Sequence, residues 1–343
     1  MTMPKGKAKE VARAETSSLA LQLSKKRRIT GDAIFANLNR ASGIAVIALL
    51  IAMIWFVLSE ATPSLRHYGI FSFFHTRWAP SEASLASSSP NPYGIVQFIY
   101  GTAIVSIIAM VISVPVGVGV ALFISEVCPK KLKKTLTTLT ELLAAVPSVV
   151  YGFWGIAVLV PALRPAAGFM ENTLAKIPGV GGFFEGPFFG FSILAASVVL
   201  SIMVLPTVIA ISREVFSTVP RDHREAAIAL GGTRWEVIRT AVLPYSRSGV
   251  VGASFLGLGR ALGETIAVTM VIGNSVLGIS WSILGQGATL ASVIANEFTE
   301  ANQPFHIESL FVAGFALMIL TLVVNVIARV IVARMGAATG RAS

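Results

Sequence analysis

Two ionisable residues, Arg260 and Glu264, stand in a long apolar stretch of the chain. Their spacing of four residues places them on one face of a continuous helix, about 6 Å apart along its axis. Ionisable side chains in a bilayer cost roughly 2.5–3.5 kcal/mol each on insertion scales, so their presence needs a reason. We predict that the pair lines a path for a charged solute, with mutual neutralisation as the alternative.

The rest of the chain offers little other chemistry. A single cysteine, Cys128, excludes a disulfide framework and a cysteine-based zinc site. The only Gly-Lys pair, Gly6-Lys7, lies in the N-terminal tail, so the sequence has no phosphate-binding P-loop. The four histidines form no metal cluster or nucleophile–base pair in the sequence: His67, His75, His223 and His306. We therefore expect a chain that is not an enzyme and that binds no metal or cofactor itself.

The composition of the chain indicates that Arg260 and Glu264 belong to a membrane protein. Of the 343 residues, 54% are hydrophobic and 13% are charged, whereas soluble domains carry about 25% charged residues. The apolar residues gather in six blocks, each long enough to cross a bilayer: about 42–59, 97–125, 136–162, 190–211, 249–273 and 309–331. These blocks predict an all-α integral membrane protein with six transmembrane helices. Prolines inside the second, third and fourth blocks are expected to kink them: Pro115, Pro147 and Pro206.

The fifth block also contains many small residues. Two spacings, Gly259-x3-Gly263 and Gly249-x3-Ala253-x3-Gly257, allow neighbouring helices to approach closely. We expect this span to be buried in a helix bundle. Arg260 and Glu264 would then face protein or a cavity, and not lipid.

The positive charges predict the orientation. The tail before the first block holds nine Lys and Arg, the link after the second holds four, the segment after the fourth holds six and the C-terminal end holds three. The other connections hold four, so the positive-inside rule places both termini in the cytoplasm. The formal net charge of +10 thus reflects membrane topology and does not indicate nucleic-acid binding. The run Lys25–Arg28 in the tail is either a topogenic cluster or a contact with membrane lipid.

The segment 212–247 has the pattern of two short helices joined by a glycine elbow. Thr218 is suited to cap the first helix, Pro220 lies in its first turn, and Gly231-Gly232 ends it. Thr233 and Glu236 form a capping-box pattern at the start of the second helix, which should stop before Pro244. Such an element would form a rigid protrusion beneath the membrane. The alternative is an ordinary helical hairpin on the membrane surface.

This segment resembles the signature of bacterial ABC import permeases. The signature reads E-A-A-x3-G-x9-I-x-L-P, and Ala241 stands where the isoleucine is usual. The resemblance implies that the segment 213–244 is a coupling helix that docks on a separate ATPase. It assigns the coupling role to these residues: Glu225, Ala226, Ala227, Gly231, Leu243 and Pro244.

Two further segments resemble the phosphate-import permeases within that family. They are Gly259–Val268, which includes Arg260 and Glu264, and the run Pro147–Gly152. The resemblance extends over about residues 40–335. The shorter Ala-Leu-Gly-Glu core also occurs in sulfate and molybdate permeases, so that core alone indicates only an oxyanion. The resemblance implies a type-I importer permease fold and inorganic phosphate as the solute, with sulfate or molybdate as the alternative.

The resemblance also implies the setting of the chain. We expect a permease subunit in the bacterial cytoplasmic membrane that pairs with a second homologous permease, two ATP-binding subunits and an extracytoplasmic phosphate-binding protein. ATP and Mg²⁺ would be bound by the ATPase. A secondary transporter, which needs no ATPase, and a membrane-embedded enzyme are the rival classes. The expected organisation is a basic tail (1–40), a first transmembrane helix with an outer loop (41–96), a transmembrane core (97–331) and a cytoplasmic C-terminal tail (332–343).

Overall fold

The computed structural model describes the backbone of residues 5–80 and 91–339, and the side chains of 32–80 and 91–335. Within these ranges the regular elements are helical, and the β-type contacts are two isolated bridges, Trp78 with Tyr93 and Gly273 with Gly287. The chain divides into two compact units, Met1–Val57 and Leu58–Ser343. The first unit is the greater part of one long helix, α1 (Lys5–Tyr68).

The second unit is a helix bundle with α6 (Ile193–Ser217) at its centre. In the most apolar stretch of α6, 72% of the residues are buried. α2 (Val96–Leu122), α4 (Ser148–Trp154), α9 (Leu243–Leu262) and α10 (Ile266–Ile272) pack on it. The long α12 (Pro304–Thr339) packs on α9 and on the short α11 (Leu290–Glu297).

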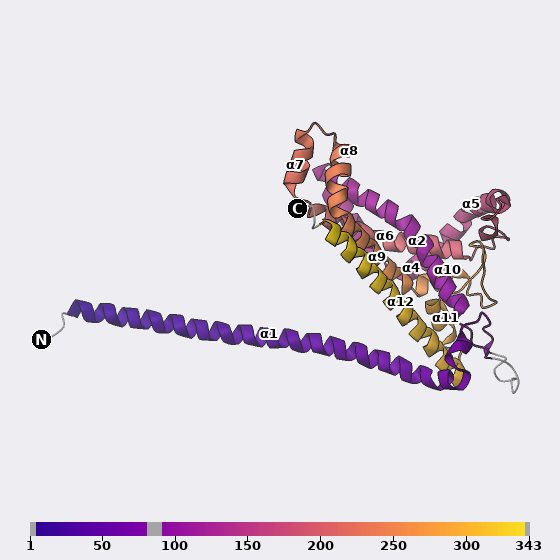
Figure 1. Cartoon of the computed structure of the whole chain (residues 1–343), viewed down its shortest axis with the longest axis horizontal. Coiled ribbons are helices and arrows are strands. Elements are labelled where there is room, and N and C mark those ends of the chain that lie inside the picture. Colours follow the sequence, from indigo (N-terminus) through magenta and orange to yellow (C-terminus); the bar gives the residue numbers. More distant parts are fainter. Residues whose placement is uncertain (1–4, 81–90, 340–343) are drawn as a thin grey trace. The chain divides into compact units, whose positions relative to one another are not determined.

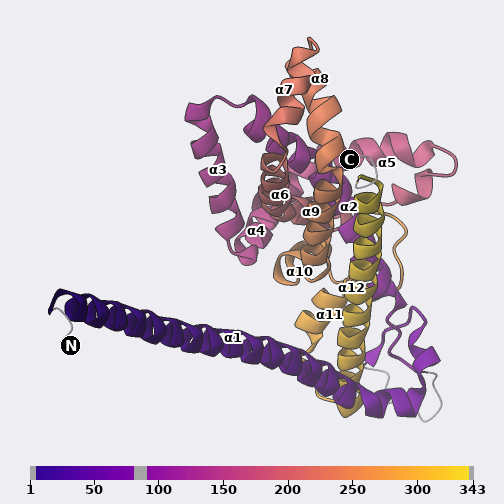
Figure 2. The same ribbon diagram turned by 60° about the vertical axis from the view of Figure 1, so that its left-hand side comes forward.

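One end of the bundle carries a helical hairpin. It consists of α7 (Arg221–Ala229) and α8 (Arg234–Val237), and the C-terminal end of α12 lies at the same end (Figures 1 and 2). α11 lies at the opposite end in both views (Figures 1 and 2). We refer to the first of these as the α7 end of the bundle.

In the described residues, five helices are long and apolar enough to cross a membrane, and there are six spans when a bent pair of helices is counted as one. This agrees with the six spans predicted from the sequence. Four predicted blocks fall on single long helices, with their ends moved by up to some ten residues. These helices are Asp32–Tyr68, Val96–Val127, Ile193–Ser217 and Pro304–Met335.

The predicted third span is present, but its limits of 136–162 are wrong, and the kink expected at Pro147 is a complete break. The chain breaks at Pro147, so that α3 (Lys130–Ala145) and α4 are separate helices. Proline disfavours helical backbone in the residue before it, and Val146 is extended, with φ −65° and ψ 127°. The third candidate span is therefore Ser148–Lys176, which runs through α4, a π-helical turn and α5 (Val160–Thr173). α3 buries none of its residues and packs along α6.

Candidate functional site

The predicted fifth span bends where its ionisable pair lies. α9 ends at Leu262, α10 begins at Ile266, and the two axes differ by 67°. Glycine has low helix propensity, and Gly263 occupies the C-cap of α9. Arg260 thus lies in the last turn of α9 and Glu264 in the bend. The prediction that both residues share one helix face is wrong, because the helix is not continuous between them.

Arg260 has an exposed side chain at the edge of the bundle. In the part of the chain that the structure describes, it forms no ion pair with Glu264. It lies close enough to Tyr151 of α4 for the two side chains to interact electrostatically. The Tyr151 hydroxyl donates a hydrogen bond of 2.8 Å to the carbonyl oxygen of Leu143 at the end of α3. Arg260 therefore lies within electrostatic range of α4, with its guanidinium available to a ligand.

Glu264 is half-buried and has a backbone partner instead of an arginine. Its Oε1 accepts a hydrogen bond of 3.4 Å from the N–H of Ala267 in the first turn of α10. A carboxylate is favourable at a helix N-terminus because it faces the unpaired N–H groups there. This position keeps the carboxylate fixed in the bend. The alternative that the two side chains simply neutralise each other has no support in this geometry.

The run Pro147–Gly152 packs against the same bend. A Cβ added to Gly152 would lie 2.5 Å from Sδ of Met270 and 3.3 Å from Cα of Ala267, so only glycine lets α4 approach α10 this closely. The two segments that resemble the phosphate-import permeases therefore meet in space. Tyr151 belongs to the run Pro147–Gly152, and its electrostatic interaction with Arg260 was not predicted from the sequence.

The helical hairpin at the α7 end agrees in part with its prediction. Gly231 has φ +83°, a conformation that favours glycine, and its N–H donates to Ile228 with a length of 2.9 Å. The capping box is present: the Thr233 side chain accepts from the Glu236 N–H, and the Glu236 carboxylate accepts from the Thr233 N–H at 2.7 Å. The glycine elbow and the second helix start are thus confirmed. Glu225 and Ala226 are exposed on α7, and Ala227 is half-buried.

Two details of the hairpin prediction are wrong. Thr218 does not cap α7, because it ends α6 and its hydroxyl donates to the carbonyl of Val215. Pro244 does not stop α8, because the chain continues through a π-helical turn, Ile238–Val242, directly into α9. Proline has no backbone N–H to pair with a preceding carbonyl, yet the helix continues through Pro244. Leu243 packs beside Val242 and Phe216 in a small core at this end.

Arg224 anchors the hairpin to the bundle, and this role was not predicted from the sequence. Its guanidinium lies 2.9 Å from Oε1 of Glu126 and also donates to the carbonyl oxygens of Phe216 and Val219. Because Glu126 lies 98 positions away in the chain, no local pattern could reveal the pair. The anchored hairpin presents apolar side chains that are 60% to 90% exposed: Ile228, Leu230 and Trp235. A fixed hairpin with an uncovered apolar tip is suited to dock on another protein.

In the described residues no group of three or more histidine, cysteine, aspartate or glutamate side chains could hold a metal ion. The two candidate centres are therefore the bend around Arg260 and Glu264 and the hairpin at the α7 end. One could contact a charged solute and the other could contact a protein.

Residues 113–337 match the family described as "Binding-protein-dependent transport system inner membrane component". A protein of Xylella fastidiosa (strain 9a5c), named phosphate transport system permease protein PstC, is 44% identical over 87% of this chain and 88% of its own length. A protein of the same name from Mesorhizobium japonicum is 41% identical over 90% of this chain and 92% of its own length.

Among solved structures, a bacterial ABC transporter involved in the import of the acidic polysaccharide alginate is similar in fold. Its matching chain gives a TM-score of 0.50 at 18% identity, over 85% of this chain and 95% of that chain. At this level of identity the similarity concerns the arrangement of helices alone.

Proposed function

Since the chain belongs to the inner membrane components of binding-protein-dependent transport systems, we infer that it is the permease subunit of an ATP-driven phosphate importer. The observation that carries this inference is the 44% identity to a phosphate transport permease over nearly the whole of both chains. The fold is that of type-I ABC importer permeases. The chain is a transport component with several membrane-spanning helices.

We propose that Arg260 and Glu264 contact phosphate in transit. Supporting this role, Arg260 is exposed and unpaired with Glu264, so its guanidinium is free to make bidentate hydrogen bonds to an oxyanion. Glu264, held by Ala267, would accept a hydrogen bond from a phosphate that keeps a proton. A fully deprotonated oxyanion lacks that donor and would be repelled by the carboxylate. This asymmetry would favour phosphate over sulfate within the path.

We propose that the α7–α8 hairpin couples the chain to a separate ATPase. The coupling residues would be Glu225, Ala226, Ala227 and Gly231 in the hairpin, with Leu243 and Pro244 at its base. The exposed apolar tip and the Arg224–Glu126 anchor support this role, since a docking element must be both accessible and rigid. ATP and Mg²⁺ would be bound by two ATPase subunits, and this chain would need no cofactor of its own.

The remaining partners follow from the same proposal. A second homologous permease would complete the path beside Arg260, and an extracytoplasmic phosphate-binding protein would deliver the solute. The excess of Lys and Arg in the N-terminal tail, in the segments at the α7 end and at the C-terminus supports a cytoplasmic position for all of them. Half of the path would then be formed by this chain.

Uptake by cells tests the phosphate assignment. We expect a strain that lacks this chain to lose high-affinity uptake of labelled phosphate and to regain it when the chain is restored. Uptake of labelled sulfate and molybdate should be the same in both strains. Loss of sulfate or molybdate uptake, with phosphate uptake unchanged, would contradict the assignment.

A further inference from the structure

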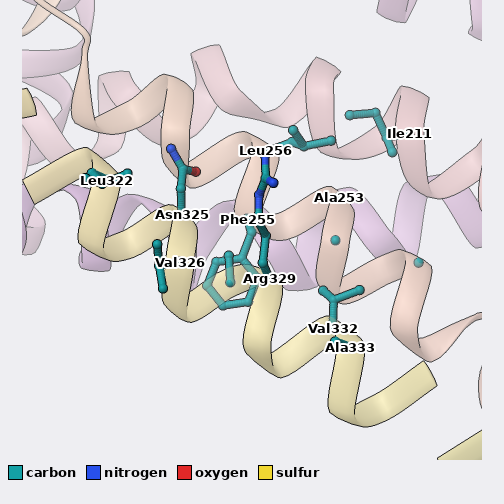
Figure 3. Close-up of a pocket in the computed structure, with 13 residues that line it drawn as sticks. Ile211, Ala253, Phe255, Leu256, Leu322, Asn325, Val326, Arg329, Val332 and Ala333 are labelled. Atoms are coloured by element: carbon teal, nitrogen blue, oxygen red, sulfur yellow. The ribbon is translucent and has the colours of Figure 1, made fainter. Parts of the chain in front are cut away.

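A groove with a volume of about 860 Å³ lies between α9 and α12 towards the α7 end (Figure 3). This volume is within the range of about 300–1,000 Å³ that is typical of small-molecule sites. Its walls are almost entirely apolar, and many of the lining residues are glycine or alanine. The only polar side chains among its lining residues are those of Asn325 and Arg329, which lie one turn apart on α12.

The groove exists because α9 packs closely on α6 along one face, whereas its face at Gly252 has no side chain to fill the adjacent space. Gly249 and Gly257 lie against α6, where an added Cβ would meet Val215 at 2.5 Å and Val204 at 2.9 Å. These two glycines pack as the sequence predicts. Gly252, between them, has no atom within 4 Å of an added Cβ. The missing side chain of Gly252 therefore leaves space in the groove.

Arg329 brings a positive charge to this apolar groove. Its side chain is exposed, and among the described residues it has no ion pair or hydrogen bond. The sequence of α9 contains no carboxylate, and the only one in α12 is Glu308, near its opposite end. Of the groove's other contributors, α6 has Glu214 within a turn of the lining residue Ile211, while Arg247 and Arg334 add positive charge nearby. The surroundings of Arg329 thus favour an anion.

Asn325 is the second polar side chain that lines the groove. Figure 3 shows Asn325 and Arg329 projecting from α12 beside Leu256 of α9. The Asn325 Oδ1 atom lies 3.8 Å from the position of a Cβ on Gly259, the residue before Arg260. An occupant of the groove would have an amide and a guanidinium as donors at one side and apolar walls along the rest.

We propose that this groove binds one anionic phospholipid. One acyl chain would lie in the space beside Gly252, and the phosphate would accept hydrogen bonds from Arg329, with Asn325 as a second donor. Basic pockets between transmembrane helices suit anionic lipid head groups, and the phosphodiester is ionised at neutral pH. A buried helix of a partner would need a carboxylate opposite Arg329, whereas a lipid carries its own counter-charge. This site is separate from the proposed path and goes beyond the proposed function.

Native mass spectrometry of the assembled transporter tests the site. The detergent-purified complex is incubated with dioleoyl phosphatidylglycerol or with zwitterionic dioleoyl phosphatidylcholine. We expect phosphatidylglycerol to remain bound in preference to phosphatidylcholine. Arg329→Gln should lower the retention of phosphatidylglycerol by about tenfold, as expected for the loss of a charge-assisted hydrogen bond. Arg164→Gln, with the same charge change on α5 outside the groove, should leave retention within about twofold of the unaltered complex.

A second pair of variants tests the apolar part of the groove. Gly252→Leu should fill the space and reduce lipid retention without changing charge. Gly119→Leu is the control, because Gly119 also has open space around it but lies on α2 outside the groove. Equal losses in Arg329→Gln and Arg164→Gln, or full retention in Gly252→Leu, would overturn the proposal. A further variant carries Leu256→Cys and Ile47→Cys in a Cys128→Ser background. Formation of a disulfide between the two introduced cysteines would show that the first span occupies the groove, and this result would also overturn the proposal.

Discussion

At the scale of single residues, Arg260 and Glu264 have separate partners. Both could be selected from the sequence because ionisable residues are rare in apolar blocks. Their relation could not, because it depends on a helix end at Leu262 inside a run that remains apolar. Glu264 accepts a hydrogen bond from Ala267, and Arg260 lies within electrostatic range of Tyr151. Each side chain can therefore act on a ligand without first breaking an ion pair.

The separation leads to a prediction for Arg260. Arg260→Ala should reduce phosphate uptake to background while the complex still assembles, because the fixed positive charge of the path is lost. Arg260→Lys should recover only part of the uptake, since an ammonium cannot reproduce the guanidinium fork. Uptake of labelled phosphate and the yield of complex are measured together. Arg247→Ala, on the same helix but outside the bend, is the control and should transport normally. Full recovery in the Arg260→Glu, Glu264→Arg double variant would show that the pair is a scaffold.

Glu264 permits a finer test because its charge and its hydrogen bond can be removed separately. Glu264→Gln keeps an oxygen that can accept from Ala267, so we expect normal assembly with impaired transport. Glu264→Ala removes both, and should also destabilise the bend by about 1 kcal/mol, as for a lost N-cap. Thermal unfolding and phosphate uptake are measured for each variant. Equal stability of the two variants would show that the bond to Ala267 is not structural.

At the scale of elements, hydropathy predicted where most helices lie but not where helices break. The blocks at 97–125 and 309–331 correspond to long helices. The blocks at 136–162 and 249–273 hide a break, since Pro147 and Gly263 interrupt the helix without interrupting the apolar run. The capping box of Thr233 and Glu236 could be predicted from the sequence, because its two residues lie three positions apart. The ion pair between Arg224 and Glu126 could not be predicted, because a contact between distant segments leaves no local pattern in the sequence.

Close packing of α2 gives a prediction about stability. A Cβ on Gly101 would overlap the carbonyl oxygen of Ala288, whereas one on Gly119 of the same helix would meet nothing within 4 Å. Gly101→Ala should therefore lower stability by roughly 1–3 kcal/mol through overpacking. Gly119→Ala should leave stability unchanged or raise it by up to about 1 kcal/mol. Thermal unfolding of the two purified variants decides this. A similar effect of both substitutions would show that α2 does not contact Ala288 so closely.

The hairpin gives a prediction about coupling. Gly231→Pro cannot adopt φ +83° and removes the N–H that donates to Ile228, so it should distort the elbow. Glu225→Lys reverses an exposed charge on α7 without altering the spans. Both variants should insert normally but lose the ATPase subunits during copurification, and transport should fall with them. Glu171→Lys, on α5 away from the hairpin, is the charge-reversal control. Normal copurification and transport in both hairpin variants would show that the ATPase docks elsewhere.

At the scale of the whole molecule, the chain is one component of a transport system. It belongs to a family of transport components, has the spans to cross a membrane and has no P-loop in its sequence. The proposed function assigns the supply of energy to another polypeptide. The proposed solute contact at the bend and the proposed ATPase contact at the hairpin lie in one chain, with α9 running between them.

The most direct test of this account is the ATPase activity of the complete transporter in proteoliposomes. The vesicles contain this chain, the second permease and the ATPase subunits, and the phosphate-binding protein is added outside. We predict that phosphate stimulates ATP hydrolysis and accumulates inside, that sulfate and molybdate do neither, and that Arg260→Ala abolishes both effects of phosphate. Stimulation by sulfate or molybdate instead of phosphate, or gradient-driven phosphate uptake by this chain without the ATPase, would contradict it.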